Sequence, residues 1–112
     1  LQVAADDRSV KAILLNLDSP GGQANGIAEA AAAIRGIAAA KPVVAYVDGL
    51  AGSAAYWLGS ASSEIVVSRT GTVGSLGAYI IVPPKRPGQP EPLQIVSSQT
   101  PNKAPNPHTD AG

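Results

Sequence analysis

The sequence contains no cysteine, no methionine and no phenylalanine, and it has one tryptophan and one histidine among 112 residues. Without cysteine the chain cannot form disulfides, bind a metal through thiolates or use a thiol nucleophile. The 8 basic and 8 acidic residues give a formal charge of +0, so we expect no surface for nucleic acid. No apolar run approaches the roughly 20 residues that span a bilayer, so we expect no membrane segment within this chain. The lack of methionine leads us to expect a piece of a longer protein.

The apolar residues, 45% of the sequence, are sufficient for a core of alanine, valine, isoleucine and leucine. Short apolar runs alternate with helical patterns, and this alternation predicts an α/β fold with a largely parallel sheet. In the first long helix, apolar side chains recur at i, i+3, i+4 and i+7, and Asn25 is the expected N-cap. The expected strands are 11–17, 43–47, 64–67 and 78–82, and the expected helices are 25–40 and 53–62.

Proline divides the chain into two parts. Eight of the ten prolines lie between Pro83 and Pro107, where we expect loop or linker with one edge strand at 93–97. The sequence therefore predicts a core domain over 1–82, incomplete at its N-terminus, followed by a truncated proline-rich segment over 83–112.

A glycine turn closes the first expected strand, at 18–22 (Asp-Ser-Pro-Gly-Gly). It lies at the carboxyl end of that strand, where open α/β sheets bind their ligands. Glycine permits a positive φ and a close approach to a substrate, so an N–H here could face a developing negative charge. The simpler interpretation of a Pro-Gly pair is a plain turn.

A serine lies at the start of the second expected helix. Ser53 follows a flexible Gly-Leu-Ala-Gly approach, and the N–H of Ala54 beside its hydroxyl is a common position for an oxyanion donor. The alternative is that Ser53 only caps the helix. The motif Gly-Ser-Ala-Ala also differs from the Gly-x-Ser-x-Gly elbow of the α/β-hydrolases.

A serine nucleophile requires a base. The single histidine, His108, lies near the chain end and would need Asp110 or Asp18 as its partner in a triad. A lysine can serve instead if burial or a nearby cation keeps its amine uncharged. Lys11 and Lys41 resemble solvated charges at element boundaries and Lys85 adjoins Arg86, whereas Lys103 has no other charge close by in sequence.

Four ordered motifs resemble the signal peptide peptidase A family of serine peptidases, which are related to the Clp protease and crotonase folds. The resemblance covers about two thirds of the chain. The segment at 98–103 is similar to the phage and prophage branch of the family, typified by minor capsid protein C. Asp18 stands where the family usually carries asparagine, and residues 54–55 are Ala-Ala where many members have Gly-Gly. The four motifs are 15–22, 51–61, 64–68 and 72–77.

The resemblance implies a fold of repeated strand-strand-helix units, present here as a partial domain, and a serine endopeptidase with a Ser/Lys dyad. It implies Ser53 as nucleophile and an oxyanion hole formed by the N–H groups of Gly22 and Ala54. It places the lysine some fifty residues after the serine, which selects Lys103. Neither a cofactor nor a metal is expected. As substrate-binding residues we expect Gly21, Leu50, Trp57 and Leu76.

The same resemblance implies a protein or peptide substrate and a homo-oligomer. A capsid-maturation protease would cleave scaffold or capsid-associated proteins in the bacterial cytoplasm or the prohead. A membrane-associated signal peptide peptidase, which would cleave signal peptides, is the alternative within the family. Two other classes stay open: a crotonase-like acyl-CoA enzyme with the same paired N–H donors, and an inactive assembly module.

Overall fold

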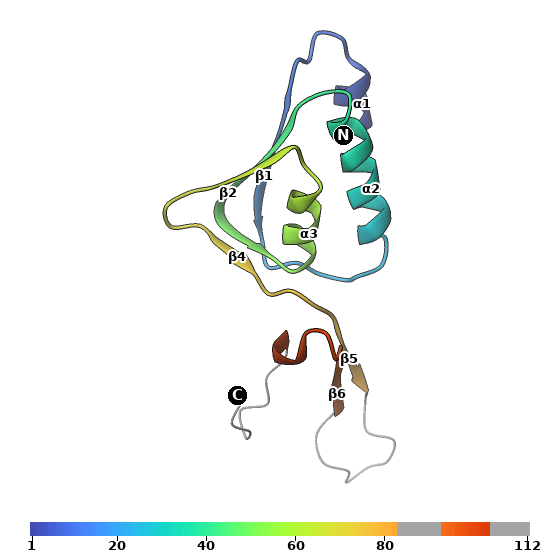
Figure 1. The fold of residues 1–112 in the computed structure, drawn as a ribbon, viewed down its shortest axis with the longest axis vertical. Helices are drawn as coiled ribbons and strands as arrows, with labels where there is room; N and C mark the ends of the chain where they lie inside the picture. Colours follow the sequence, from blue (N-terminus) through green and yellow to red (C-terminus); the bar gives the residue numbers. More distant parts are fainter. Residues whose placement is uncertain (83–92, 104–112) are drawn as a thin grey trace. The chain divides into compact units, whose positions relative to one another are not determined.

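The structure is a computed structural model that describes residues 1–82 and 93–103. Most of the proline-rich segment, with Lys85 and His108, lies outside the described residues. The chain forms two compact units, Leu1–Gly74 and Ser75–Gly112, and each is described by itself (Figure 1).

The first unit is built on a parallel sheet. β2 (Val43–Gly52) is its long central strand and pairs with β1 (Ile13–Ser19) on one side. Along its other side, β2 pairs first with β3 (Glu64–Val67) and then with β4 (Thr72–Gly74). All these pairings are parallel, which confirms the expected α/β fold with a mostly parallel sheet.

Three helices accompany the sheet: α1 (Gln2–Asp6), α2 (Ile27–Ala38) and α3 (Ala54–Ser60). Alternate residues of β2 point into the core, where Val43, Ala45 and Val47 are completely buried. α3 lies close to the sheet at Gly59, since this glycine has no side chain; a Cβ added there would lie 2.8 Å from Cδ1 of Leu17. The small side chains of the core thus allow backbones to pack at short distances.

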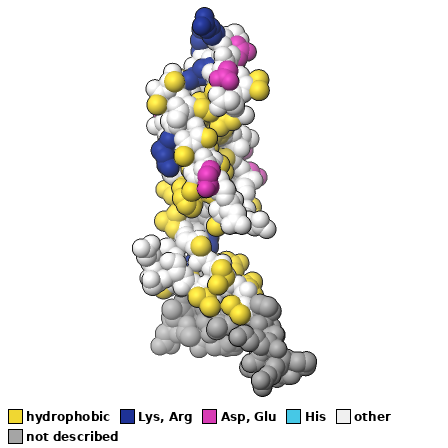
Figure 2. Space-filling model, turned by 90° about the vertical axis from the view of Figure 1, so that its right-hand side faces the viewer, with side chains coloured by type: hydrophobic (Ala, Val, Ile, Leu, Met, Phe, Trp, Pro, Cys, Tyr) yellow, Lys and Arg dark blue, Asp and Glu magenta, His cyan; other side chains and the backbone are white. Residues whose placement is uncertain are grey.

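Surface residues show which faces the described part of the chain leaves open. Leu14 of β1, which lies between the buried Ile13 and the partly buried Leu15, is 67% exposed. On the face that carries α1 and α2, apolar side chains mix with charged groups of both signs (Figure 2). Several alanines of α2 are exposed and add small apolar side chains to the surface. Among the described residues, no helix is both long and apolar enough to cross a bilayer.

Two details of the secondary structure in the first unit differ from expectation. The N-cap of α2 is Gly26 and not Asn25; Gly26 has φ 80°, a left-handed conformation that glycine adopts without steric cost. Residues 72–74, which lie outside the expected strands, form β4, because the long β2 continues past β3 and pairs with them along its free edge.

The second unit contains an antiparallel pair of strands, β5 (Tyr79–Val82) and β6 (Leu93–Val96). It also contains a short 3₁₀ turn, η1 (Pro101–Lys103). The expected edge strand is thereby confirmed as β6. The expected fourth strand also forms, as β5, but it pairs antiparallel with β6 and is not part of the parallel sheet.

Lys41 is a structural residue and not the solvated charge expected from the sequence. Its Nζ donates hydrogen bonds to the backbone oxygens of Ala4 at 3.0 Å, Ala5 at 2.8 Å and Asp7 at 2.8 Å. The oxygens of Ala4 and Ala5 belong to the last turn of α1, and that of Asp7 to its C-cap, where a cation is favoured. Lys41 therefore holds α1 against the loop that enters β2.

We predict that Lys41→Met lowers the free energy of unfolding by about 1–2 kcal/mol, because three carbonyls lose a charged donor. Lys11→Met is the matched control, since within the described part of the chain Nζ of the exposed Lys11 donates one hydrogen bond, to the Arg8 oxygen at 3.0 Å. Urea denaturation of both variants measures the difference. Equal stability of the two variants would contradict this role of Lys41.

The Asp7 carboxyl has a lowered pKa. Hydrogen bonds from the Ser9 hydroxyl and the Ser9 backbone N–H are the main causes, and the charge of Lys41 acts in the same direction. Because the pKa is lower in the folded chain, the stability that Asp7 contributes is complete above its ordinary value of about 3.9 and is lost as the pH falls through the lowered pKa.

We predict that Ser9→Ala raises the pKa of Asp7 toward its ordinary value, because the variant lacks the hydroxyl that donates to this carboxylate. A titration followed by carboxyl ¹³C NMR measures the change. An unchanged Asp7 titration in this variant would show that Ser9 is not the cause.

Candidate active site

The glycine turn and the serine motif come together at one edge of the parallel sheet. β1 leads into Pro20 and Gly21, and the adjacent β2 leads into Ser53, so both motifs follow carboxyl ends of neighbouring strands (Figure 1). A Cβ added at Gly21 would lie 2.7 Å from Cβ of Ser53 and 3.0 Å from the nitrogen of Ala54. The Gly21 backbone therefore lies directly against the serine.

Glycine is required at this contact for two reasons. Gly21 has φ +106°, a conformation that side chains with a Cβ rarely adopt. Behind it, a Cβ added at Gly52 would lie 2.8 Å from the backbone oxygen of Pro20. The two chain segments thus approach at main-chain distance on both sides of Ser53.

Ser53 occupies a strained position between strand and helix. Its φ of 53° and ψ of −117° are unusual for serine, and such conformations occur preferentially at functional sites. Its backbone N–H donates to the oxygen of Gly74 at 2.8 Å, and its oxygen accepts from the N–H of Trp57 at 3.0 Å. The serine hydroxyl makes no capping hydrogen bond, although Ser53 stands at the N-cap position of α3. The interpretation of this serine as a mere cap is therefore weakened.

The two expected oxyanion donors lie on either side of this contact. Ala54 is the first residue of α3, so its N–H is among those that a helix leaves without an internal acceptor. Gly22 follows Gly21 directly, and a Cβ added to it would meet nothing within 4 Å. Within residues 1–82 and 93–103, no backbone oxygen outside the helices and strands accepts the Gly22 N–H. Among the described residues, neither N–H therefore donates to a backbone oxygen of a turn or loop, as the expected oxyanion donors require.

Leu50 and Trp57, which we expect to bind substrate, flank the serine along the chain. Leu50 is half-buried in β2, and its N–H donates to Oδ1 of Asp18 at 3.1 Å. Trp57 lies on α3 and is 45% exposed. Leu76, the third apolar residue of the set, belongs to the second unit and is 58% exposed.

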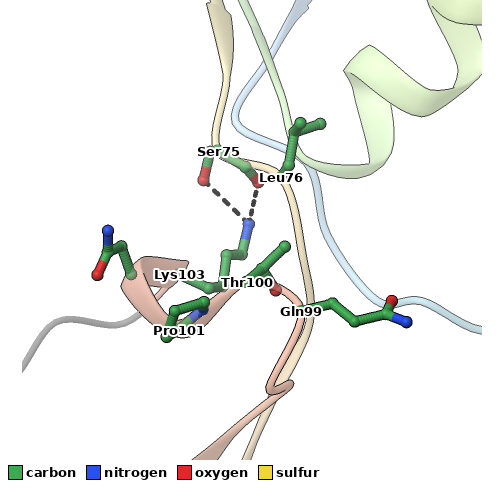
Figure 3. Close-up of a pocket in the computed structure, with 7 residues that line it drawn as sticks. Ser75, Leu76, Gln99, Thr100, Pro101 and Lys103 are labelled. Atoms are coloured by element: carbon green, nitrogen blue, oxygen red, sulfur yellow. Dashed lines mark hydrogen bonds between the residues drawn. The ribbon is translucent and has the colours of Figure 1, made fainter.

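The expected general base, Lys103, is held within the second unit by a residue that the sequence analysis did not single out. Nζ of Lys103 donates to the Ser75 backbone oxygen and, at 2.9 Å, to Ser75 Oγ (Figure 3). Ser75 has φ 56°, again unusual for serine. Ser75 lies within the motif at 72–77 (Thr-Val-Gly-Ser-Leu-Gly), and this position was the sequence signal that could have identified it as a site residue.

A pocket of about 360 Å³ surrounds the Lys103 amine. Polar side chains from the segment before and within η1 line it together with Leu76, and a Cβ added at Gly77 would collide with the Thr100 side chain (Figure 3). The lining residues are Ser75, Leu76, Gln99, Thr100, Pro101, Asn102 and Lys103.

The parallel sheet, its helices and the serine beside a glycine turn define part of an α/β domain of the Clp protease/crotonase-like class. Residues 36–83 match the sequence model of Peptidase family S49. Over this segment the chain is therefore similar to peptidase family S49, the signal peptide peptidase A-like family.

Three relatives illustrate the breadth of this similarity. The chain is 44% identical over 80 residues to the head-tail preconnector protein GP5 of Enterobacteria phage P21. It is 41% identical over 80 residues to Protease 4 of Salmonella typhi and 40% identical over 80 residues to capsid assembly protease C of Escherichia phage lambda. These alignments cover 71%, 68% and 71% of this chain, but only 16%, 12% and 18% of the respective relatives.

We predict that Gly21→Ala lowers the free energy of unfolding by about 1–3 kcal/mol, because the new methyl group collides with Ser53 and φ is unfavourable for alanine. Gly22→Ala is the matched control, since its Cβ enters open space. Chemical denaturation of the two variants gives the comparison. If Gly21→Ala were as stable as Gly22→Ala, the close contact with Ser53 would not exist in solution.

Proposed function

We propose that the full protein is a serine endopeptidase in which Ser53 is the nucleophile and Lys103 the general base. The close contact of the Gly21 backbone with Ser53 carries this proposal, since it brings a hydroxyl free of capping and two N–H donors to one edge of the sheet. Similarity of the matched segment to peptidase family S49 supports the same assignment.

In the proposed reaction the uncharged ε-amine of Lys103 accepts the proton of the Ser53 hydroxyl as Oγ attacks a peptide carbonyl. The carbonyl oxygen becomes an oxyanion that accepts hydrogen bonds from the N–H groups of Gly22 and Ala54. The ammonium of Lys103 then protonates the departing amine. Water, deprotonated by the same lysine, hydrolyses the acyl-enzyme and restores Ser53.

Ser75 has a proposed role in this reaction because its hydroxyl oxygen lies 2.9 Å from Nζ of Lys103. A hydroxyl at this distance fixes the direction in which the amine points, and orientation of the base toward the nucleophile contributes strongly to catalysis. The same distance also makes Ser75 the second possible nucleophile in the chain, so the experiment below tests both serines.

As substrate class we propose phage proteins that are cleaved during head assembly. Two of the three relatives described above are named for this setting, one as a capsid assembly protease and one as a head-tail preconnector protein. The third, Protease 4, carries a name for peptide hydrolysis alone.

We predict that in the full-length protein Ser53→Ala and Lys103→Ala each lower cleavage of a protein substrate by at least about 10³-fold, because each removes a group that takes part in bond breaking. Ser75→Ala should retain measurable activity with a reduced kcat. Glu29→Gln, at an exposed position on α2, serves as a control for general damage.

Labelling with a fluorophosphonate, followed by peptide mass spectrometry, identifies the nucleophile in the same variants. The proposal requires a label on Ser53 that disappears in Ser53→Ala and persists in Ser75→Ala. A label on Ser75, or no label on either serine, would refute it; the second result is the one expected of an acyl-CoA enzyme or an inactive assembly module.

A further inference from the structure

Asp18 lies where the pairing between β1 and β2 changes register. Pairing that is regular up to Leu17 resumes with Ser19 opposite Ala51, so Asp18 alone faces residues 48–50 of β2. Such a bulge bends the strand and interrupts the regular ladder of hydrogen bonds. The bulge occurs directly before β2 delivers the serine motif.

The Asp18 carboxylate fills this bulge. Its Oδ1 accepts a hydrogen bond from the Leu50 backbone N–H at 3.1 Å. The same group lies closely against Gly49, because a Cβ added there would be 2.5 Å from Oδ1 and 2.9 Å from Cγ. The Asp18 side chain thus accepts a hydrogen bond from Leu50 and packs against Gly49.

We infer that Asp18 is a positioning residue for the active site, an inference that rests on the function proposed above. The carboxylate fixes the bulge from which the chain runs through Gly52 into Ser53. Beyond the bulge, the backbone oxygen of Pro20 lies 2.8 Å from a Cβ added at Gly52, so the two segments have little freedom to adjust. A bulge that shifts by a fraction of an ångström moves the serine relative to the glycine turn.

The chemistry required at position 18 is an acceptor oxygen of the right reach. Oδ1 acts on the Leu50 N–H as an acceptor, and the amide oxygen of asparagine has the same geometry. Alanine offers no acceptor and leaves the bulge unfilled. Asp18→Asn should therefore preserve the arrangement, and Asp18→Ala should lose it.

The test uses the full-length protein with a cleavable peptide substrate. We expect Asp18→Ala to lower kcat by about tenfold to a hundredfold and to change KM by less than about threefold, because misplacement acts on the transition state. Asp18→Asn should stay within about threefold of the unmodified enzyme. Asp48→Asn is the control, since among residues 1–82 and 93–103 Oδ1 of Asp48 accepts one side-chain hydrogen bond, from the Tyr46 hydroxyl at 3.4 Å.

Gly49→Ala provides a second route that leaves the carboxylate in the chain. The added methyl group pushes the Asp18 carboxylate away from Leu50, and kcat should fall as it does in Asp18→Ala. In the double variant the methyl group meets no carboxylate, so the combined loss should be smaller than the product of the two single losses. This route decides the question if Asp18→Ala does not fold.

Hydrogen exchange at the Leu50 amide gives a readout that is independent of turnover. The exchange should accelerate in Asp18→Ala and Gly49→Ala and stay unchanged in Asp18→Asn and Asp48→Asn. If kcat or Leu50 exchange is unaltered in Asp18→Ala while labelling still depends on Ser53, the role of Asp18 is refuted and the proposed function stands. Labelling that does not depend on Ser53 would instead refute the proposed function.

Discussion

The backbone of Gly21 lies against Ser53 and the nitrogen of Ala54, and the other features of the first unit maintain this contact. Parallel pairing of β1 with β2 brings the carboxyl ends of both strands to one edge of the sheet. Glycine at position 21 allows the main chains to approach at a distance that any side chain would prevent. A strand, a turn and the start of a helix thereby meet at Ser53.

The strained backbone of Ser53 persists because the surrounding structure fixes the positions of the glycine turn and of the serine motif. The unfavourable conformation of Ser53, which costs of order 1–3 kcal/mol, is held by the hydrogen bond from its N–H to Gly74 and by the first turn of α3. The small, fully buried side chains of Val43 and Val47 fix β2 in the core. The free energy of packing in the sheet thus offsets local strain at the serine, a relationship that is common at functional sites.

The apolar runs predict β1, β2 and β3 of the parallel sheet, whereas β4 was not expected and the expected fourth strand pairs elsewhere. The closeness of Gly21 and Ser53 follows from the parallel pairing of β1 and β2, which brings both carboxyl ends to one edge. The positive φ of Ser53 could not be predicted, because it opposes the local preference of serine and is imposed by residues distant in sequence. The contact between Asp18 and Leu50 depends on a change of register, which no local pattern encodes. The pairing of Lys103 with Ser75 likewise arises from residues far apart in sequence.

The structure of the full-length protein after reaction with a fluorophosphonate tests the central claim most directly. The account predicts a covalent bond from Ser53 Oγ to phosphorus, with the phosphonyl oxygen about 3 Å from the nitrogens of both Gly22 and Ala54. A phosphonyl oxygen that faces away from these two nitrogens, or an adduct on another residue, would contradict it.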